Sequence, residues 1–155
     1  MTDYEREPAA IEEMLVAYAH MPIMLYQATA SIPEDSALVA SAVGEWSIAQ
    51  IVTHLWMVDG HALVTFAGAE PPHEEVMKPQ NPHSFLARRD EFELRRAAVV
   101  AALRNLLPDS WDTPYPFRSV EWSARALVAG FVRHDNDHLQ QIIATRHIVE
   151  MGFRP

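Results

Sequence analysis

Two histidines spaced four residues apart, His134 and His138, give this sequence its clearest chemical signal. On a helix, residues at this spacing lie on one face. The apolar residues Leu127, Phe131 and Ile142 share that face, so we expect both imidazoles to point into the protein. A buried imidazole without a partner costs about 1–3 kcal/mol, and a divalent metal ion would supply the partner. Pairs of hydrogen-bonded or surface histidines show the same spacing, so the pair alone is compatible both with a metal site and with histidines that bind no metal.

A third histidine, His54, lies among apolar residues at helical spacing and is also expected to face inward. Counted from the serine that precedes each predicted helix, the three histidines fall within a sector of roughly 80° at about 100° per residue. One histidine from one helix and two from another would form a three-nitrogen metal site. Such a site keeps coordination positions for water or substrate, as catalytic metals require. Zinc, nickel and ferrous iron all suit three imidazoles.

Several polar residues could serve this site. Three of them could orient the imidazoles by accepting their second N–H, or could simply be solvated: Asp135, Asp137 and Gln141. His61 follows His54 by two helical turns and either lines a pocket or belongs to the core or rim. Arg118 and Arg133 could hold a substrate carboxylate or lie on the surface. The other histidines are expected outside the site, and three tryptophans are expected to pack rather than form a substrate cage: His20, His73, His83 and His147; Trp56, Trp111 and Trp122.

Proline and glycine divide the chain into four segments with apolar residues at helical spacing. The predicted helices run from Pro8 to Thr29, from Ser47 to Gly68, from near Ser84 to before Pro108, and from near Ser123 to Gly152. Ser47 and Gln50 form a capping-box pair at the second start. No segment shows sustained strand alternation, so residues 32–46, 69–83 and 108–122 are expected to be long connections. The pattern predicts an all-α four-helix bundle whose up-down topology stays open.

A short sequence echo precedes the second and fourth helices. Glu45-Trp46-Ser47 and Glu121-Trp122-Ser123 each place a tryptophan before a predicted N-cap. We interpret each indole as a hydrophobic staple that covers a helix start.

Composition excludes several classes of function. The chain of 155 residues fits one domain over 1–155, and its net charge of −9 disfavours nucleic acid and anionic membranes as partners. It has no cysteine, so a catalytic thiolate would have to come from a bound small thiol. The uncharged stretch 14–33 is interpreted as a buried helix rather than a membrane span, and the charged start is unlike a signal peptide. We therefore expect a cytoplasmic protein.

The order of these motifs resembles the DinB/YfiT-like superfamily over nearly the whole chain. The resemblance rests on Trp46-Ser47, Ile51, His54-Leu55, Asp59, the region of Trp111, and His134-Asp135-x-x-His138-Leu139-x-Gln141. It implies a four-helix bundle, often dimeric, with a divalent metal held by three histidines that correspond to His54, His134 and His138. Asp59 stands where members often have Glu. Because it lies about 140° from His54 on the helix, we expect a structural or supporting role.

The resemblance implies several reactions. Some members are thiol-dependent isomerases or S-transferases, in which a metal lowers the pKa of a small thiol that then attacks an electrophile. This implies a small-molecule substrate, a low-molecular-weight thiol as cofactor and a homodimer. Other members are described as metal-dependent hydrolases, with water as the nucleophile. A non-catalytic dimeric bundle with a structural or absent metal is the alternative of a different class.

Overall fold

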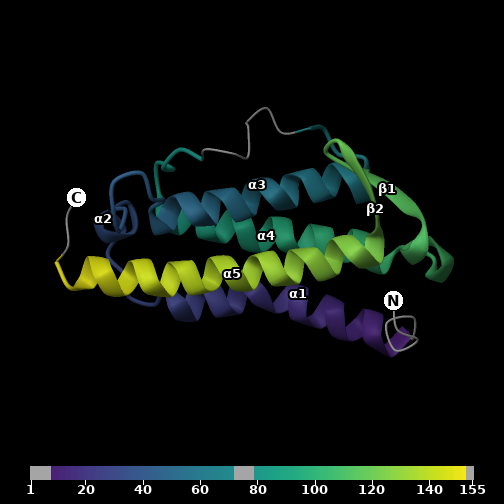
Figure 1. Ribbon diagram of the computed structural model, residues 1–155, viewed down its shortest axis with the longest axis horizontal. Helices are drawn as coiled ribbons and strands as arrows, with labels where there is room; N and C mark the ends of the chain where they lie inside the picture. Colours follow the sequence, from purple (N-terminus) through teal and green to yellow (C-terminus); the bar gives the residue numbers. More distant parts are fainter. Residues whose placement is uncertain (1–7, 72–78, 153–155) are drawn as a thin grey trace.

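The computed structural model describes residues 8–71 and 79–152. Four long helices pack lengthwise against one another (Figure 1): α1 (Pro8–Ala28), α3 (Ile48–Ala67), α4 (Phe85–Arg104) and α5 (Ala124–Glu150). α1 and α3 each pack against both α4 and α5. The predicted four-helix bundle is therefore confirmed, with helix bounds within a few residues of those expected.

The direction of the helices settles the topology that helix order left open. The colours in Figure 1 show that α3 and α4 run in one direction, whereas α1 and α5 run in the other. α3 and α4 are neighbours, as are α1 and α5, so the bundle contains two parallel pairs. Because the consecutive helices α3 and α4 are parallel, the end of α3 and the start of α4 lie at opposite ends of the bundle. The long connection expected at 69–83 joins these two ends.

Serine residues are the N-caps of three of the helices. Ser47 Oγ accepts a hydrogen bond from Gln50 N at 3.1 Å, and Gln50 Oε1 accepts one from Ser47 N at 2.9 Å. This is the predicted capping box. Ser84 and Ser123 cap α4 and α5 with the side-chain oxygen alone, which accepts a hydrogen bond from Ala87 N and from Ala126 N. Gly68, at φ 64°, ends α3 in the left-handed conformation that glycine adopts without strain.

The expected connection 108–122 is not wholly irregular, because it contains a short helix and a β-hairpin. A short 3-10 helix, η2 (Pro108–Asp112), leads into β1 (Pro114–Phe117) and β2 (Val120–Ser123). The strands pair antiparallel, with Pro114 opposite Ser123 and Phe117 opposite Val120. Each strand has only four residues, which is too few for an alternating pattern to emerge from the sequence. A single helical turn, α2 (Glu34–Ala37), likewise lies within 32–46.

The interior is divided into two apolar clusters along the bundle. The cluster near α2 is formed by residues that include Leu25, Ile51, Leu55, Phe85, Phe92 and Ile142. The cluster near the hairpin includes Leu15, Val99, Leu103, Trp111, Leu127 and Phe131. Trp111 is thus a packing residue, as expected. Among the described residues, none of the helices has the length and apolar character that crossing a membrane requires.

Candidate metal centre

The three histidines singled out in the sequence converge inside the bundle. His54 comes from α3, and His134 and His138 come from successive turns of α5. His134 Nε2 lies 2.9 Å from His54 Nε2 and 3.2 Å from His138 Nε2. Taken together, one ring nitrogen from each histidine lies within 4.8 Å of the other two. All three side chains are half-buried, so the group is neither a surface cluster nor sealed from solvent.

Gln141 fixes which nitrogen of His138 faces the group. His138 Nδ1 lies 2.9 Å from Gln141 Oε1. An amide oxygen only accepts hydrogen bonds, so Nδ1 carries the proton and Nε2 keeps its lone pair. Burial lowers the pKa of His138, which favours this neutral form. Gln141 therefore has the orienting position that the sequence suggested for it.

The three facing nitrogens cannot satisfy one another. His134 Nε2 contacts the other two Nε2 atoms, but a neutral ring nitrogen can form only one hydrogen bond, either donated or accepted. A cation can take all three lone pairs at once. Metal–nitrogen bonds of about 2.0–2.1 Å place the nitrogens of a tetrahedral site roughly 3.3 Å apart, close to the distances of 2.9 and 3.2 Å found here. The donor set therefore fits a divalent metal ion.

The two predicted orienting carboxylates do not hydrogen-bond to the histidines. Asp135 Oδ1 is 3.8 Å from His134 Nδ1, which is beyond hydrogen-bond distance. Within the described part of the chain, buried His134 Nδ1 has no hydrogen-bond partner. Asp137 is exposed, in agreement with its solvated alternative. Of the three suggested orienting residues, only Gln141 contacts an imidazole.

Asp59 instead belongs to a buried charge cluster. Its carboxylate accepts hydrogen bonds from Tyr18 Oη at 2.9 Å and from Arg96 at 2.8 and 3.0 Å. Arg96 also donates to Asp135 Oδ2 at 2.7 Å and to the carbonyl oxygen of Tyr18 at 2.8 Å. The side chains of Arg96 and Asp59 are only 2% and 1% exposed, so this arginine is wholly inside the protein. The carboxylate of Asp59 is thus engaged in the core, apart from the three histidines.

Sequence reasoning missed Arg96 and Tyr18. Arg96 occupies the helical spacing of Phe92, Val99 and Leu103, all of which are fully buried. An arginine at an apolar position is itself a signal, because such a residue must find buried acceptors. Its partners, however, come from α1, α3 and α5, and their arrangement follows only from the folded structure.

Trp46 covers one side of the histidines. Its ring centroid lies 5.0 Å from that of His54, and it stacks on His138 at 6.1 Å with an interplanar angle of 12°. The sequence assigned this indole only to the start of α3. Its place two turns before His54 is the signal that could have suggested a role at the site.

A cavity of about 590 Å³ lies on another side of the group. His54 and His134 open onto it, whereas His138 is not among the described residues that line it. Its further lining combines apolar and aromatic side chains with three basic ones: Val58, Phe117, Val120, Trp122, Leu127 and Phe131; His61, Arg118 and Arg133. Trp122 is 48% exposed and forms part of this wall, contrary to the expectation that it only packs. The hairpin missed in the sequence supplies one side of the cavity.

His61 is one of the predicted pocket residues that the structure places in the cavity. Its ring meets Phe117 edge-on, with centroids 6.4 Å apart. Burial and the positive charge of Arg118 lower the pKa of His61. Trp56, by contrast, lies elsewhere, between the guanidinium groups of Arg88 and Arg95 at 4.0 and 3.7 Å.

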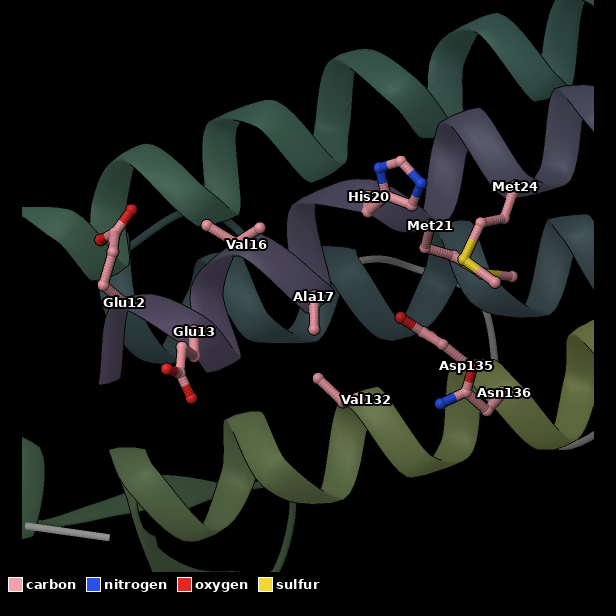
Figure 2. Close-up of a pocket in the computed structure, with 10 residues that line it drawn as sticks. All are labelled: Glu12, Glu13, Val16, Ala17, His20, Met21, Met24, Val132, Asp135 and Asn136. Carbon is pink, nitrogen blue, oxygen red and sulfur yellow. The ribbon is translucent and has the colours of Figure 1, made fainter. Parts of the chain in front are cut away.

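A larger cavity, of about 780 Å³, lies between α1 and α5. Figure 2 shows Glu12, Glu13 and His20 on α1, with Asp135 and Asn136 on α5. None of His54, His134 and His138 lines it, although Asp135 connects it to the buried charge cluster. His20 thus lies outside the histidine group, as expected. His147 is exposed near the end of α5, His83 lies in the 79–83 connection, and His73 falls outside the described residues.

Comparison with known proteins supports these assignments of fold. YfiT from Bacillus subtilis, described as a probable metal-dependent hydrolase with an unusual four-helix bundle topology, superposes with a TM-score of 0.73 at 16% identity, covering 95% of this chain and 90% of its own. A DinB-like protein from Bacillus cereus gives a TM-score of 0.72 at 16% identity, covering 93% of this chain and 95% of its own. No curated protein sequence matches significantly. Residues 17–142 match the sequence profile of the DinB superfamily. The chain therefore belongs to the DinB superfamily.

Proposed function

We propose that this protein is a divalent-metal-dependent enzyme with His54, His134 and His138 as the metal ligands. The observation that carries the proposal is the convergence of three ring nitrogens within 4.8 Å at the wall of a cavity. Within the described residues, no carboxylate or further histidine joins this group. Three protein ligands are typical of catalytic sites, since structural zinc sites are usually closed by four.

The chemistry expected of such a site is activation of a small nucleophile. A bound divalent ion supplies Lewis acidity, which lowers the pKa of a water or thiol ligand towards neutrality. Residues of the chain support this chemistry in three ways. Gln141 fixes the ring of His138, Trp46 covers one side from solvent, and the cavity beside His54 and His134 receives the substrate.

Water and a low-molecular-weight thiol are the two nucleophiles that we propose. Water would make the protein a hydrolase, and the description of YfiT in those terms favours this choice. A thiol would make it an S-transferase or isomerase. Because the chain has no cysteine, such a thiol would have to bind from solution, and a cavity of about 590 Å³ has room for one.

Metal content tests the site directly. Purified wild-type protein should hold one divalent ion per chain by elemental analysis, and His134→Ala should lose it. His147→Ala is the matched control, because His147 is an exposed histidine on the same helix. Equal metal content in wild type and His134→Ala would overturn the proposal.

A second measurement separates the two nucleophiles. Cobalt-loaded protein is titrated with small thiols while thiolate-to-cobalt absorption is followed, and hydrolysis of 4-nitrophenyl acetate is assayed in parallel. Absorption without ester hydrolysis indicates thiol chemistry, and hydrolysis without absorption indicates water. If the protein holds metal but neither signal appears, the alternative of a non-catalytic bundle replaces an enzyme.

A further inference from the structure

Two arginines beside the histidine group lack acceptors for their guanidinium groups. The structure describes nine arginines, and seven of them donate to a carboxylate, hydroxyl or carbonyl oxygen: Arg88, Arg89, Arg95, Arg96, Arg104, Arg125 and Arg146. Within the described chain, Arg118 and Arg133 have no hydrogen bond or ion pair of this kind. Both of them line the cavity that His54 and His134 open onto. Among the described arginines, the two whose guanidinium groups have no acceptor in the protein are both exposed and line the same cavity.

The charge of this cavity is opposite to that of the whole protein. The chain carries a net charge of −9, yet no Asp or Glu occurs among the described residues that line the cavity. Its permanently charged side chains are Arg118 and Arg133. Acidic side chains that would neutralise them are excluded from the wall, so the cavity is expected to attract anions.

The hairpin places Arg118 at a position that arginine rarely occupies. Arg118 is the first residue of the two-residue turn between β1 and β2, and its φ is 57°. A turn with a positive φ at this position usually takes Gly, Asn or Asp. An arginine here costs about 1 kcal/mol or more of backbone strain. The turn therefore places a guanidinium group at the cavity, although glycine would adopt this backbone conformation with less strain.

We propose that this cavity binds a substrate bearing a carboxylate or phosphate group, which Arg118 and Arg133 hold while the reactive part lies at His54 and His134. The inference rests on the proposed function and names its substrate class. Guanidinium groups form charge-assisted hydrogen bonds with both kinds of anion. The apolar body of the substrate packs against the aromatic wall that includes Phe117, Trp122 and Phe131.

Calorimetric titration of metal-loaded protein tests this assignment. The probes are 3-phenylpropionate, its uncharged amide, and inorganic phosphate. We expect the carboxylate or phosphate to bind and the amide to bind at least about tenfold more weakly, as expected for charge-assisted contacts. Comparison of 3-phenylpropionate with 2-phenylethylphosphonate, which has the same apolar body, identifies the preferred anionic group. Equal affinity for the acid and the amide, together with no binding of phosphate, would overturn the proposal.

Substitution of the arginines identifies the groups responsible. Arg118→Gln and Arg133→Gln should each weaken anion binding about tenfold, whereas Arg118→Lys should restore part of it. Arg104→Gln is the matched control, because Arg104 is an exposed arginine that pairs with Glu12 and is not among the residues that line the cavity. Anion affinity that is unchanged in both glutamine variants would overturn the proposal.

Metal-free protein separates this proposal from the proposed function. If the arginines hold the anion, binding should remain within about threefold of the metal-loaded value after a chelator has removed the metal from wild-type protein. If the anion instead binds the metal alone, removal of the metal abolishes binding and both arginine variants leave it unchanged, which overturns the substrate assignment but leaves the metal site intact. Conversely, anion binding that depends on Arg118 and Arg133 would stand even if elemental analysis found no metal.

Discussion

Two polar clusters lie side by side on the same helices and are built in opposite ways. His54 and Asp59 are five residues apart on α3, and His134 and Asp135 are adjacent on α5. The Asp59 cluster is closed, because each nitrogen of Arg96 donates to an oxygen of the protein. The histidine group is open, because its nitrogens face one another and a cavity.

This difference is the one expected between a group that stabilises the fold and a group that binds a ligand. Asp59, Arg96 and Asp135 each lie between residues of the two apolar clusters on their own helix. There they join three helices through the hydrogen bonds that Arg96 donates to both carboxylates. The facing Nε2 atoms of the three histidines cannot all satisfy one another, because His134 Nε2 lies within hydrogen-bond distance of both of the others. A buried arginine hydrogen-bonded to two carboxylates indicates a structural role, and convergent imidazole nitrogens beside a cavity indicate a candidate binding site.

The largest effect is expected from breaking the closed cluster. Arg96→Met leaves the carboxylates of Asp59 and Asp135 buried without their cation, which should cost about 3–5 kcal/mol of unfolding free energy. Urea unfolding measures this loss. Arg104→Met, which removes an exposed ion pair with Glu12, should cost less than about 1 kcal/mol. Similar losses in the two variants would contradict the structural role of the closed cluster.

The two clusters also differ in how far the sequence predicts them. His54, His134 and His138 were predictable because helical spacing alone places each ring on an inward face. Arg96 also lies at helical spacing among apolar residues. Its hydrogen-bond partners, however, lie on three other helices, and no local sequence pattern predicts them. The hairpin could not be predicted because strands of four residues show almost no periodicity in the sequence. The role of Trp46 could not be predicted because its contact with His138 joins residues 92 positions apart.

The open cluster can be weakened without removing a ligand. Gln141→Leu removes the acceptor that fixes the proton on His138 Nδ1. Loss of such an orienting partner lowers metal affinity about 10–100-fold. Competition with a chelator of known affinity measures the change. Gln140→Leu, at an exposed neighbouring position, is the control and should leave the affinity unchanged. Equal affinities of the two variants would show that the Gln141 contact does not orient the site.

A larger side chain at Gly130 can reduce the volume of the cavity beside the histidine group. This residue lies inside α5, lines the cavity, and would meet no atom within 4 Å if it carried a Cβ. Gly130→Ala should therefore raise the unfolding free energy by about 1 kcal/mol, the usual gain from replacing a helical glycine. Gly130→Leu should keep the metal but block 3-phenylpropionate. Thermal unfolding and calorimetry check the two effects, and undiminished binding in Gly130→Leu would show that the ligand lies elsewhere.

The smallest expected effect reports the charge of the open side. Burial first, and then Arg118, lower the pKa of His61, so Arg118→Gln should move this pKa part of the way back towards 6.5. A lowered pKa means that the unfolded chain binds more protons, so His61 makes the folded protein less stable as pH falls below about 6.5. NMR titration of the His61 ring measures the shift directly, with Arg104→Gln as control. Binding of an anion beside Arg118 should raise the same pKa in the wild type. A His61 pKa that responds to neither change would contradict the placement of the Arg118 guanidinium group at the cavity. The cavity would then show no electrostatic preference for an anionic substrate.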